Sequence, residues 1–129
     1  MITFLDTDVL IDCPRGTSSA HEWLARAASE TFQVPGIVAM ELVVGCQNQS
    51  DLQRTHEFLS SFDVVWPDAA EFAQAYELLA AHYLASGLSI PDCLIAAMTL
   101  SRSARLYTFN LRHFRAVPEL AVEAPYARA

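Results

Sequence analysis

The feature that most constrains the fold is the alternation of short apolar segments with longer segments of helical character. Five short segments have the composition of buried strands: residues 2–6, 32–34, 63–66, 106–109 and 120–122. Strands that are separated by helices predict βαβ units, and hence a mainly parallel sheet with helices on both faces. The sequence therefore predicts an α/β fold. We expect residues 1–129 to form a single domain, because no repeat or linker interrupts them.

The segments between these strands have helical patterns. Helices are expected at residues 7–13, 18–30, 37–46, 51–61, 68–86 and 91–100, with a short turn or helix at 110–114. The longest has one apolar stripe at helical spacing: Phe72, Tyr76, Leu79 and Tyr83. Within residues 37–46, four apolar residues are expected to be largely buried: Val38, Met40, Val43 and Val44. Ser50 is the expected cap of the helix at 51–61.

The basic residues are all arginine, and the absence of lysine excludes several kinds of active site. A Walker P-loop, a Schiff base and protein-kinase chemistry all need a lysine. The net charge of −7 argues against phosphate-backbone binding over the whole surface. The charge is uneven, however, because residues 93–118 contain four arginines and no acidic residue. This segment could hold an anionic ligand beside the acidic remainder of the chain.

The cysteine and histidine patterns exclude two further kinds of site. Three cysteines without CxxC spacing argue against a disulfide framework and against a cysteine zinc site. The four histidines lack the spacing of zinc ligands. The longest stretch without Asp, Glu, Lys or Arg is residues 78–91, which is shorter than the roughly 20 residues that a bilayer requires. We therefore expect a reduced, cytoplasmic protein that does not span a membrane.

Four acidic residues lie among apolar neighbours: Asp6, Asp8, Glu41 and Asp92. A buried carboxylate is costly, and several together repel one another unless a cation holds them. Hard oxygen ligands select Mg²⁺ or Mn²⁺, and such an ion commonly activates water against a phosphodiester. Taken singly, the residues have simpler explanations. Asp6 and Asp8 could cap a helix, Glu41 could face solvent, and Asp92 could favour the helix dipole.

Four motifs together carry a family resemblance: LDTDVLID at 5–12, VAMELVVG at 38–45, PDCLIAAMTL at 91–100 and LYTFNLRHF at 106–114. In this order they resemble a PIN domain, most closely the VapC-type toxins of toxin–antitoxin pairs. The resemblance implies a three-layer α/β/α sandwich. It implies an endoribonuclease that binds Mg²⁺ or Mn²⁺ through Asp6, Glu41 and Asp92, with Asn110 as the fourth catalytic position.

The same resemblance implies substrate contacts and partners. Thr108 could hydrogen-bond a metal-bound carboxylate or a substrate phosphate, and Arg112 could contact flanking phosphates of the RNA substrate. The implied partners are a cognate antitoxin protein and a second copy of the chain, in a homodimer or a larger assembly. Two positions depart from the family pattern. Asp8 stands where the family often has Asn, and Asn110 stands where the wider family often has Asp.

Two other functions remain open at this stage. The chain could be a non-catalytic PIN-like module that binds a protein with the apolar helices between residues 7 and 61. It could also be a phosphatase of the haloacid-dehalogenase type, because Asp6-Thr7-Asp8-Val9 resembles the nucleophile motif of that class with Asp6 as nucleophile. The absence of lysine disfavours this second alternative, because that class uses a lysine or an arginine to hold the phosphoryl group.

Overall fold

The computed structural model describes residues 2–12, 22–23, 25 and 31–127. Its elements, in chain order, are β1 (Ile2–Leu5), α1 (Thr7–Asp12), β2 (Thr31–Pro35), α3 (Gly36–Val44), α4 (Gln49–Leu59), β3 (Asp63–Val65), α5 (Ala69–Ser86), α6 (Ile90–Ser101), β4 (Arg105–Tyr107), α7 (Leu111–Phe114) and β5 (Val122–Glu123). The helix expected at residues 18–30 falls almost entirely outside the described residues.

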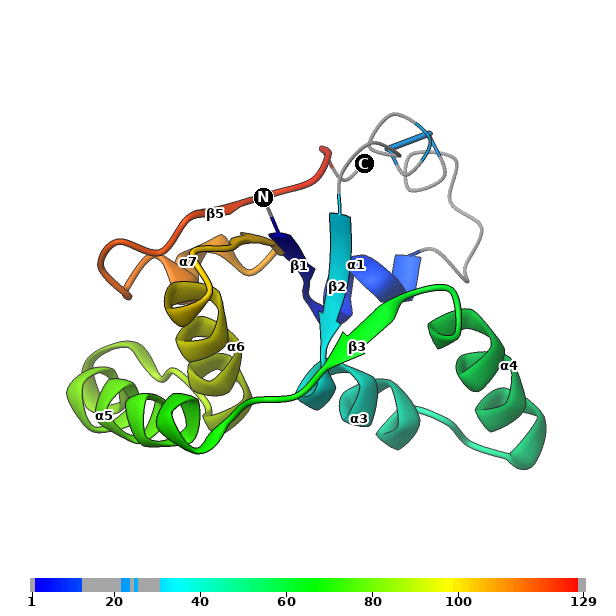
Figure 1. Ribbon diagram of the computed structural model, residues 1–129, viewed down its shortest axis with the longest axis horizontal. Coiled ribbons are helices and arrows are strands. Elements are labelled where there is room, and N and C mark those ends of the chain that lie inside the picture. Colours follow the sequence, from blue (N-terminus) through cyan, green and yellow to red (C-terminus); the bar gives the residue numbers. More distant parts are fainter. Residues whose placement is uncertain (1, 13–21, 24, 26–30, 128–129) are drawn as a thin grey trace.

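The five strands form one parallel sheet in the order β3-β2-β1-β4-β5. β1 lies at its centre, with Ile2 opposite Thr31 of β2 and Leu5 opposite Tyr107 of β4. Helices α5 and α6 cover one side of this sheet, while α1 and α4 lie on the other (Figure 1). The expected α/β sandwich around a parallel sheet is therefore confirmed.

Local signals in the sequence fix the two helices that pack on one side of the sheet. Asp68 caps α5, because its carboxylate accepts from the N–H of Glu71 over 2.8 Å. The carboxylate of Glu71 in turn accepts from the N–H of Asp68, which completes a capping box. Gly87 ends α5 with a φ of 73°, a conformation that favours glycine. Ser89 caps α6, whose residues from Cys93 to Thr99 are all buried.

Helices α3 and α4 differ from the expectations in detail. Asn48, not Ser50, caps α4, because its side chain accepts from the N–H of Asp51 over 2.8 Å. On α3 only Val38 of the four expected residues is buried, and Val44 is 84% exposed. Met40 and Val43 are also exposed, since α3 turns only one narrow face toward the core. A uniformly apolar segment has no period from which the buried face could be read.

The apolar stripe of α5 is present but points outward. Three of its members are exposed: Phe72, Tyr76 and Tyr83. The buried residues of α5 are Glu71 and Ala75, which face α6. The core lies instead between the sheet and its covering helices, with Phe4, Ile95 and Leu106 fully enclosed or nearly so. Among the helices that the structure describes, none combines the length and apolarity that crossing a membrane requires.

Candidate active site at the carboxyl edge of the sheet

The candidate site residues come from segments that leave the same edge of the sheet. Asp6 follows β1, Thr108 and Asn110 follow β4, and Glu41 lies on α3, which continues directly from β2. Parallel strands end at a common edge, and ligands of open α/β sheets bind there. In Figure 1 this edge is the lower one, where α3 begins and where the first residues of α6 also lie.

Asp6 is the most enclosed of the candidate carboxylates, at 8% exposed. Its Oδ1 accepts from the N–H of Thr7 over 2.8 Å, and its Oδ2 accepts from the hydroxyl of Thr108 over 2.8 Å. Burial, followed by the negative charge of Asp8, raises the pKa of Asp6 from 3.8 to about 7. The two hydrogen bonds oppose this rise. The charged form of Asp6 is thus costly in the metal-free protein.

Glu41 is joined to Asp6 through a shared neighbour. The hydroxyl of Thr7 donates to Oε1 of Glu41 over 2.9 Å, while the N–H of Thr7 holds Asp6. Helices α1 and α3 pack against each other, which brings these residues together from positions 34 apart in the chain. The carboxylates of Asp6 and Glu41 therefore both accept hydrogen bonds from Thr7. The motifs of the sequence predicted that these two side chains would lie close together.

Asp92 lies in the first turn of α6 and has two relationships. Its Oδ2 accepts from the N–H of Ser89 over 3.3 Å, which completes the capping box of α6. Its negative charge also contributes to the raised pKa of Asp6, so the two carboxylates are within electrostatic reach. As the side chains stand, no three His, Cys, Asp or Glu residues of the described segments lie close enough to hold a metal ion. A three-carboxylate metal site would require the Asp92 side chain to leave its hydrogen bond to Ser89 and rotate toward Asp6.

The segment after β4 supports Asp6 from the other side. Thr108 is fully buried, and its hydroxyl donates to the carboxylate of Asp6. The N–H of Asn110 donates to the same threonine oxygen over 3.0 Å. The Asn110 amide nitrogen lies 3.1 Å from Nδ1 of His113. Arg112 is exposed on α7, two residues after Asn110.

Asp8 ties α1 to this same segment. Its two carboxylate oxygens lie 3.3 and 3.2 Å from the N–H of Phe109, and one of them lies 3.4 Å from the hydroxyl of Thr108. The sequence allowed Asp8 to be a helix cap or a neighbour of the site. The structure shows the second arrangement, with Asp8 close enough to raise the pKa of Asp6.

The basic segment supplies fewer free cations than its charge suggested. The guanidinium of Arg102 binds both oxygens of Glu71 at 2.8 and 2.9 Å and the carbonyl of Trp66 at 2.8 Å. Arg105 binds Glu123 at 2.9 Å. Arg112 and Arg115 are exposed. Two of the four arginines are therefore engaged in structural ion pairs.

Glu71 is a buried charge that the sequence analysis did not single out. It is 2% exposed, and the hydrogen bond from Arg102 lowers its pKa to about 2. Ser101 also donates to it, so Glu71 joins the start of α5 to the end of α6. The signal that could have revealed Glu71 was the Asp68-x-x-Glu71 capping box, which marks the glutamate as oriented toward its own backbone.

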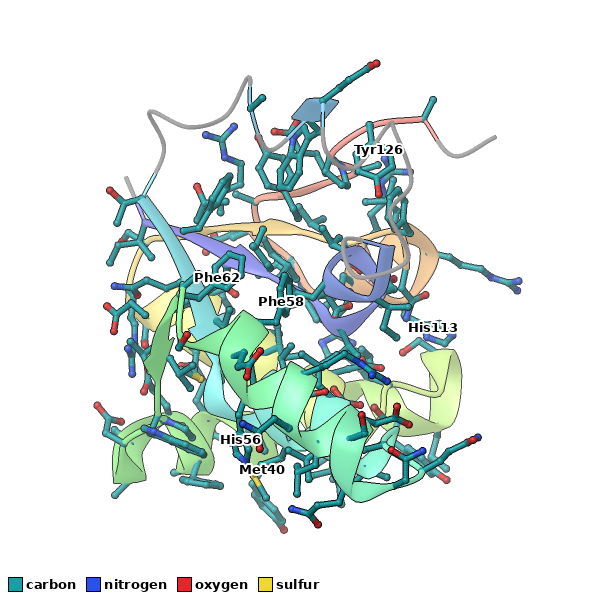
Figure 2. All side chains as sticks on the ribbon, turned by 90° about the vertical axis from the view of Figure 1, so that its right-hand side faces the viewer. Met40, His56, Phe58, Phe62, His113 and Tyr126 are labelled. Atoms are coloured by element: carbon teal, nitrogen blue, oxygen red, sulfur yellow. The ribbon has the colours of Figure 1, made fainter. Side chains whose placement is uncertain are left out.

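A hollow of about 520 Å³ lies next to Glu41. Its lining comes from α1, α3, α4 and the segment joining the last two: Ile11, Glu41, Leu42, Gly45, Cys46, Asp51, Arg54, Thr55 and Phe58. Figure 2 views this side of the molecule and shows Phe58 beside Phe62, whose ring centroids are 5.2 Å apart. The same view shows His56 and His113 well separated.

The donor atoms of the candidate carboxylates, as distinct from their present positions, suit a hard divalent cation. Asp6, Glu41 and Asp92 offer only oxygen donors, which suit Mg²⁺ or Mn²⁺. Within the described part of the chain, no arginine forms an ion pair with any of these three residues. The pKa of Asp6 is high because nothing described there compensates its buried charge. A bound cation would supply that compensation.

Comparisons with known proteins show the family of the chain. The sequence profile of the PIN domain family matches residues 3–120. The chain is 34% identical to Ribonuclease VapC19 of Mycobacterium tuberculosis over an alignment of 127 positions, which covers 95% of this chain and 98% of that protein.

Two solved structures are also similar to the chain. One is a toxin–antitoxin complex from Klebsiella pneumoniae, with a TM-score of 0.78 and 27% identity. The other is VapBC2 from Rickettsia felis bound to a DNA fragment from its promoter, with a TM-score of 0.78 and 26% identity. Each match covers 96% of this chain and 98% of the matched chain. The chain therefore belongs to the PIN domain family, and within it to the VapC members.

Proposed function

We propose that this chain is the toxin of a type II toxin–antitoxin system and that it hydrolyses phosphodiester bonds of RNA as a divalent-metal-dependent endoribonuclease. The observation that carries the proposal is the buried carboxylate of Asp6, whose pKa is raised to about 7, with Glu41 bound to the same Thr7. The relative from M. tuberculosis is named a ribonuclease, and the similar solved structures are toxin–antitoxin complexes. We further propose that residues 1–129 act as one nuclease domain in the cytoplasm.

In this proposal Asp6, Glu41 and Asp92 hold Mg²⁺ or Mn²⁺. When bound, the ion would lower the pKa of a water molecule and stabilise negative charge on the phosphate. Thr7 orients Asp6 through its N–H and Glu41 through its hydroxyl, and Thr108 orients Asp6 through its hydroxyl. The Asn110 side chain orients water or substrate, and exposed Arg112 contacts a flanking phosphate of the RNA.

The antitoxin is proposed to occupy the hollow that α1, α3 and α4 form beside Glu41. A neutralising partner has to reach the carboxylates, and this hollow of about 520 Å³ has Glu41 in its wall. Its lining combines apolar side chains with Asp51 and Arg54, which suits the apolar face of a helix with polar residues at its edge.

A second copy of the chain is proposed to cover the exposed face of α5 and the start of α6. Six residues line a shallow hollow there: Tyr76, Leu79, Ala80, Tyr83, Leu84 and Ile90. None of them carries a charge, so this face suits an equally apolar partner. In a two-fold symmetric dimer the same face of the second copy would be that partner. Helix α5 lies across the sheet from α4, so this face and the antitoxin hollow are separate (Figure 1).

The test is cleavage of RNA by purified protein that is free of antitoxin. Wild-type protein should cut RNA with Mg²⁺ or Mn²⁺ and lose this activity with EDTA. Asp6→Asn and Asp92→Asn should each lower the cleavage rate at least a hundredfold, because each removes a metal ligand. Undiminished cleavage by these variants would refute the site. Wild-type protein that is inactive on every RNA while it binds an antitoxin would instead identify a non-catalytic binding module.

A trapped aspartyl-phosphate on Asp6 would point to the phosphatase alternative. The reagent for that test is a small phosphate monoester that carries a radioactive label on its phosphorus atom. Label that stays on the wild-type chain and is absent from Asp6→Asn would replace the nuclease proposal. We expect none, because the nuclease proposal gives Asp6 a ligand role and not a nucleophilic one.

A further inference from the structure

We propose that Thr7 is a positioning residue that couples the two carboxylates of the proposed metal site, and that its hydroxyl group sets the affinity for the metal ion through Glu41. This inference rests on the proposed function. Thr7 holds Asp6 and Glu41 at once, through its N–H at 2.8 Å and its hydroxyl at 2.9 Å. A single residue therefore donates a hydrogen bond to each of two proposed metal ligands that lie far apart in the chain.

Glu41 depends on this contact more than Asp6 does. Asp6 is buried and accepts hydrogen bonds on both of its oxygens. Glu41 is half-buried on α3, and no other hydrogen bond to its carboxylate is found within the residues that the structure describes. A glutamate side chain loses considerable rotamer freedom when it is fixed. The hydrogen bond from the Thr7 hydroxyl restricts the Glu41 side chain to one rotamer before a metal ion binds.

The two bonds of Thr7 can be separated by substitution. The bond to Asp6 comes from the backbone N–H and survives any replacement except proline. The bond to Glu41 comes from the side chain and needs a hydroxyl group. Thr7→Val keeps the shape and the branched Cβ but removes the hydroxyl, while Thr7→Ser keeps the hydroxyl and removes a methyl group. The pair of variants thus isolates the single contact between Thr7 and Glu41.

The experiment measures Mn²⁺ binding by isothermal titration calorimetry with full-length, antitoxin-free protein. Thr7→Val should bind Mn²⁺ about tenfold more weakly than wild type, the effect of losing one hydrogen bond to a charged group. Thr7→Ser should stay within about threefold of wild type. Thermal unfolding in EDTA checks that the variants are folded. Thr7→Ala replaces Thr7→Val if the valine variant does not fold.

A double-mutant cycle then tests whether Thr7 acts through Glu41. In a Glu41→Ala background the further change Thr7→Val should alter the Mn²⁺ affinity less than about twofold, because no acceptor for the Thr7 hydroxyl is left at position 41. A tenfold loss that persists in this background would overturn the coupling, since Thr7 would then act on another group. A purely structural role would lower the unfolding temperature of Thr7→Val without weakening Mn²⁺ binding, and that outcome also overturns the inference.

Failure of the inference can be told apart from failure of the proposed function. Wild-type protein that binds no Mn²⁺ would refute the metal site, and the role of Thr7 with it. Wild-type protein that binds Mn²⁺ as tightly as Thr7→Val does would refute only the role of Thr7. Loss of affinity in Thr7→Val, retained affinity in Thr7→Ser and no further loss in the Glu41→Ala background together support it.

Discussion

The hydroxyl of Thr108 donates a 2.8 Å hydrogen bond to Oδ2 of Asp6, although 102 positions separate the two residues in the chain. The parallel pairing of β1 with β4 makes this contact possible, because it places the ends of both strands side by side. The bond favours the charged form of Asp6, whereas burial and the charge of Asp8 favour the neutral form and prevail. Asp6 therefore changes its charge near neutral pH in the metal-free protein.

The raised pKa of Asp6 predicts that Asp6→Asn stabilises the metal-free protein at alkaline pH. The pKa rises from 3.8 in the unfolded chain to about 7 in the folded protein, so the folded state loses stability as the pH rises through this window. At pH 8, Asp6→Asn should increase the free energy of unfolding by up to about 4 kcal/mol. At pH 3 the gain should vanish. Urea unfolding in EDTA at both pH values measures the difference.

The exposed Glu77 on the outer part of α5 provides the matched control for this experiment. Glu77→Gln removes the same charge from the surface and should change the stability little at either pH. Mg²⁺ should stabilise wild-type protein at pH 8 and should stabilise Asp6→Asn much less, because the ion compensates the buried charge. An equal gain from Asp6→Asn at pH 3 and pH 8 would contradict the assigned pKa.

Asp8→Asn should lower the pKa of Asp6. The charge of Asp8 is the second cause of the raised pKa, after burial, and asparagine removes it. The asparagine oxygen can still accept from the N–H of Phe109, so the turn after β4 keeps its anchor. A ¹³C NMR titration of the aspartate carboxyl groups in metal-free protein should show the Asp6 midpoint at a lower pH than in wild type. An unmoved midpoint would show that burial alone raises it.

The sequence predicted the strands and most helices because their signals are local. The capping boxes at Asp68 and Ser89 and the glycine at position 87 mark helix ends within a few residues. The order of the motifs also predicted that Asp6 and Glu41 would meet. The burial of α3 could not be predicted, because Met40 and Val44 are as apolar as Val38, and only the position of α3 beside the sheet decides which of them is covered.

The contacts that tune the site were beyond the sequence for a different reason. Thr7, Asp8 and Thr108 act on Asp6 or Glu41 over distances that depend on strand pairing and helix packing. The orientation of Asp92, whose carboxylate accepts from the N–H of Ser89, is set by a side-chain rotamer, which no spacing of residues encodes. Helix propensity and hydrophobic periodicity predict where helices and strands lie. The side-chain rotamers within a site depend on the tertiary contacts that form once these elements have packed together.

Glu71→Gln should destabilise the fold and leave the metal site intact. Glutamine cannot form the ion pair with Arg102 and leaves a guanidinium without its charged partner, at a cost of about 3 kcal/mol at pH 7. The pKa of Glu71 is lowered to about 2, so its contribution is present above pH 4.5 and is lost as the pH falls toward 2. Urea unfolding at pH 7 and pH 3 should therefore show a smaller difference between variant and wild type at pH 3.

Two further measurements complete the test of Glu71. Glu77→Gln changes an exposed glutamate on the same helix and should cost less than about 0.5 kcal/mol. The Mn²⁺ affinity of Glu71→Gln should match that of wild type, because Glu71 joins α5 to the end of α6, whereas Asp92 lies at its beginning. A large loss of Mn²⁺ affinity would mean that the ion pair also holds the start of α6 in place.

Leu84→Arg should convert the protein from a dimer to a monomer. Leu84 is 95% exposed and lies beside Tyr76 and Tyr83, which are 72% and 56% exposed, on the face proposed to meet a second copy. In a two-fold symmetric contact each substitution appears twice, so two buried arginines would be introduced without acidic partners among the residues that line this hollow. Sedimentation equilibrium should give twice 14.2 kDa for wild type and 14.2 kDa for Leu84→Arg.

The control for this substitution is Gln53→Arg, which adds the same charge to an exposed position of α4 on the opposite side of the sheet. It should leave the mass of the dimer unchanged. Because Asp6, Glu41 and Asp92 all belong to one chain, the Leu84→Arg monomer should still bind Mn²⁺ with wild-type affinity. A Leu84→Arg variant that remains dimeric would place the contact between copies elsewhere, and a monomeric wild-type protein would leave the α5 face to another partner.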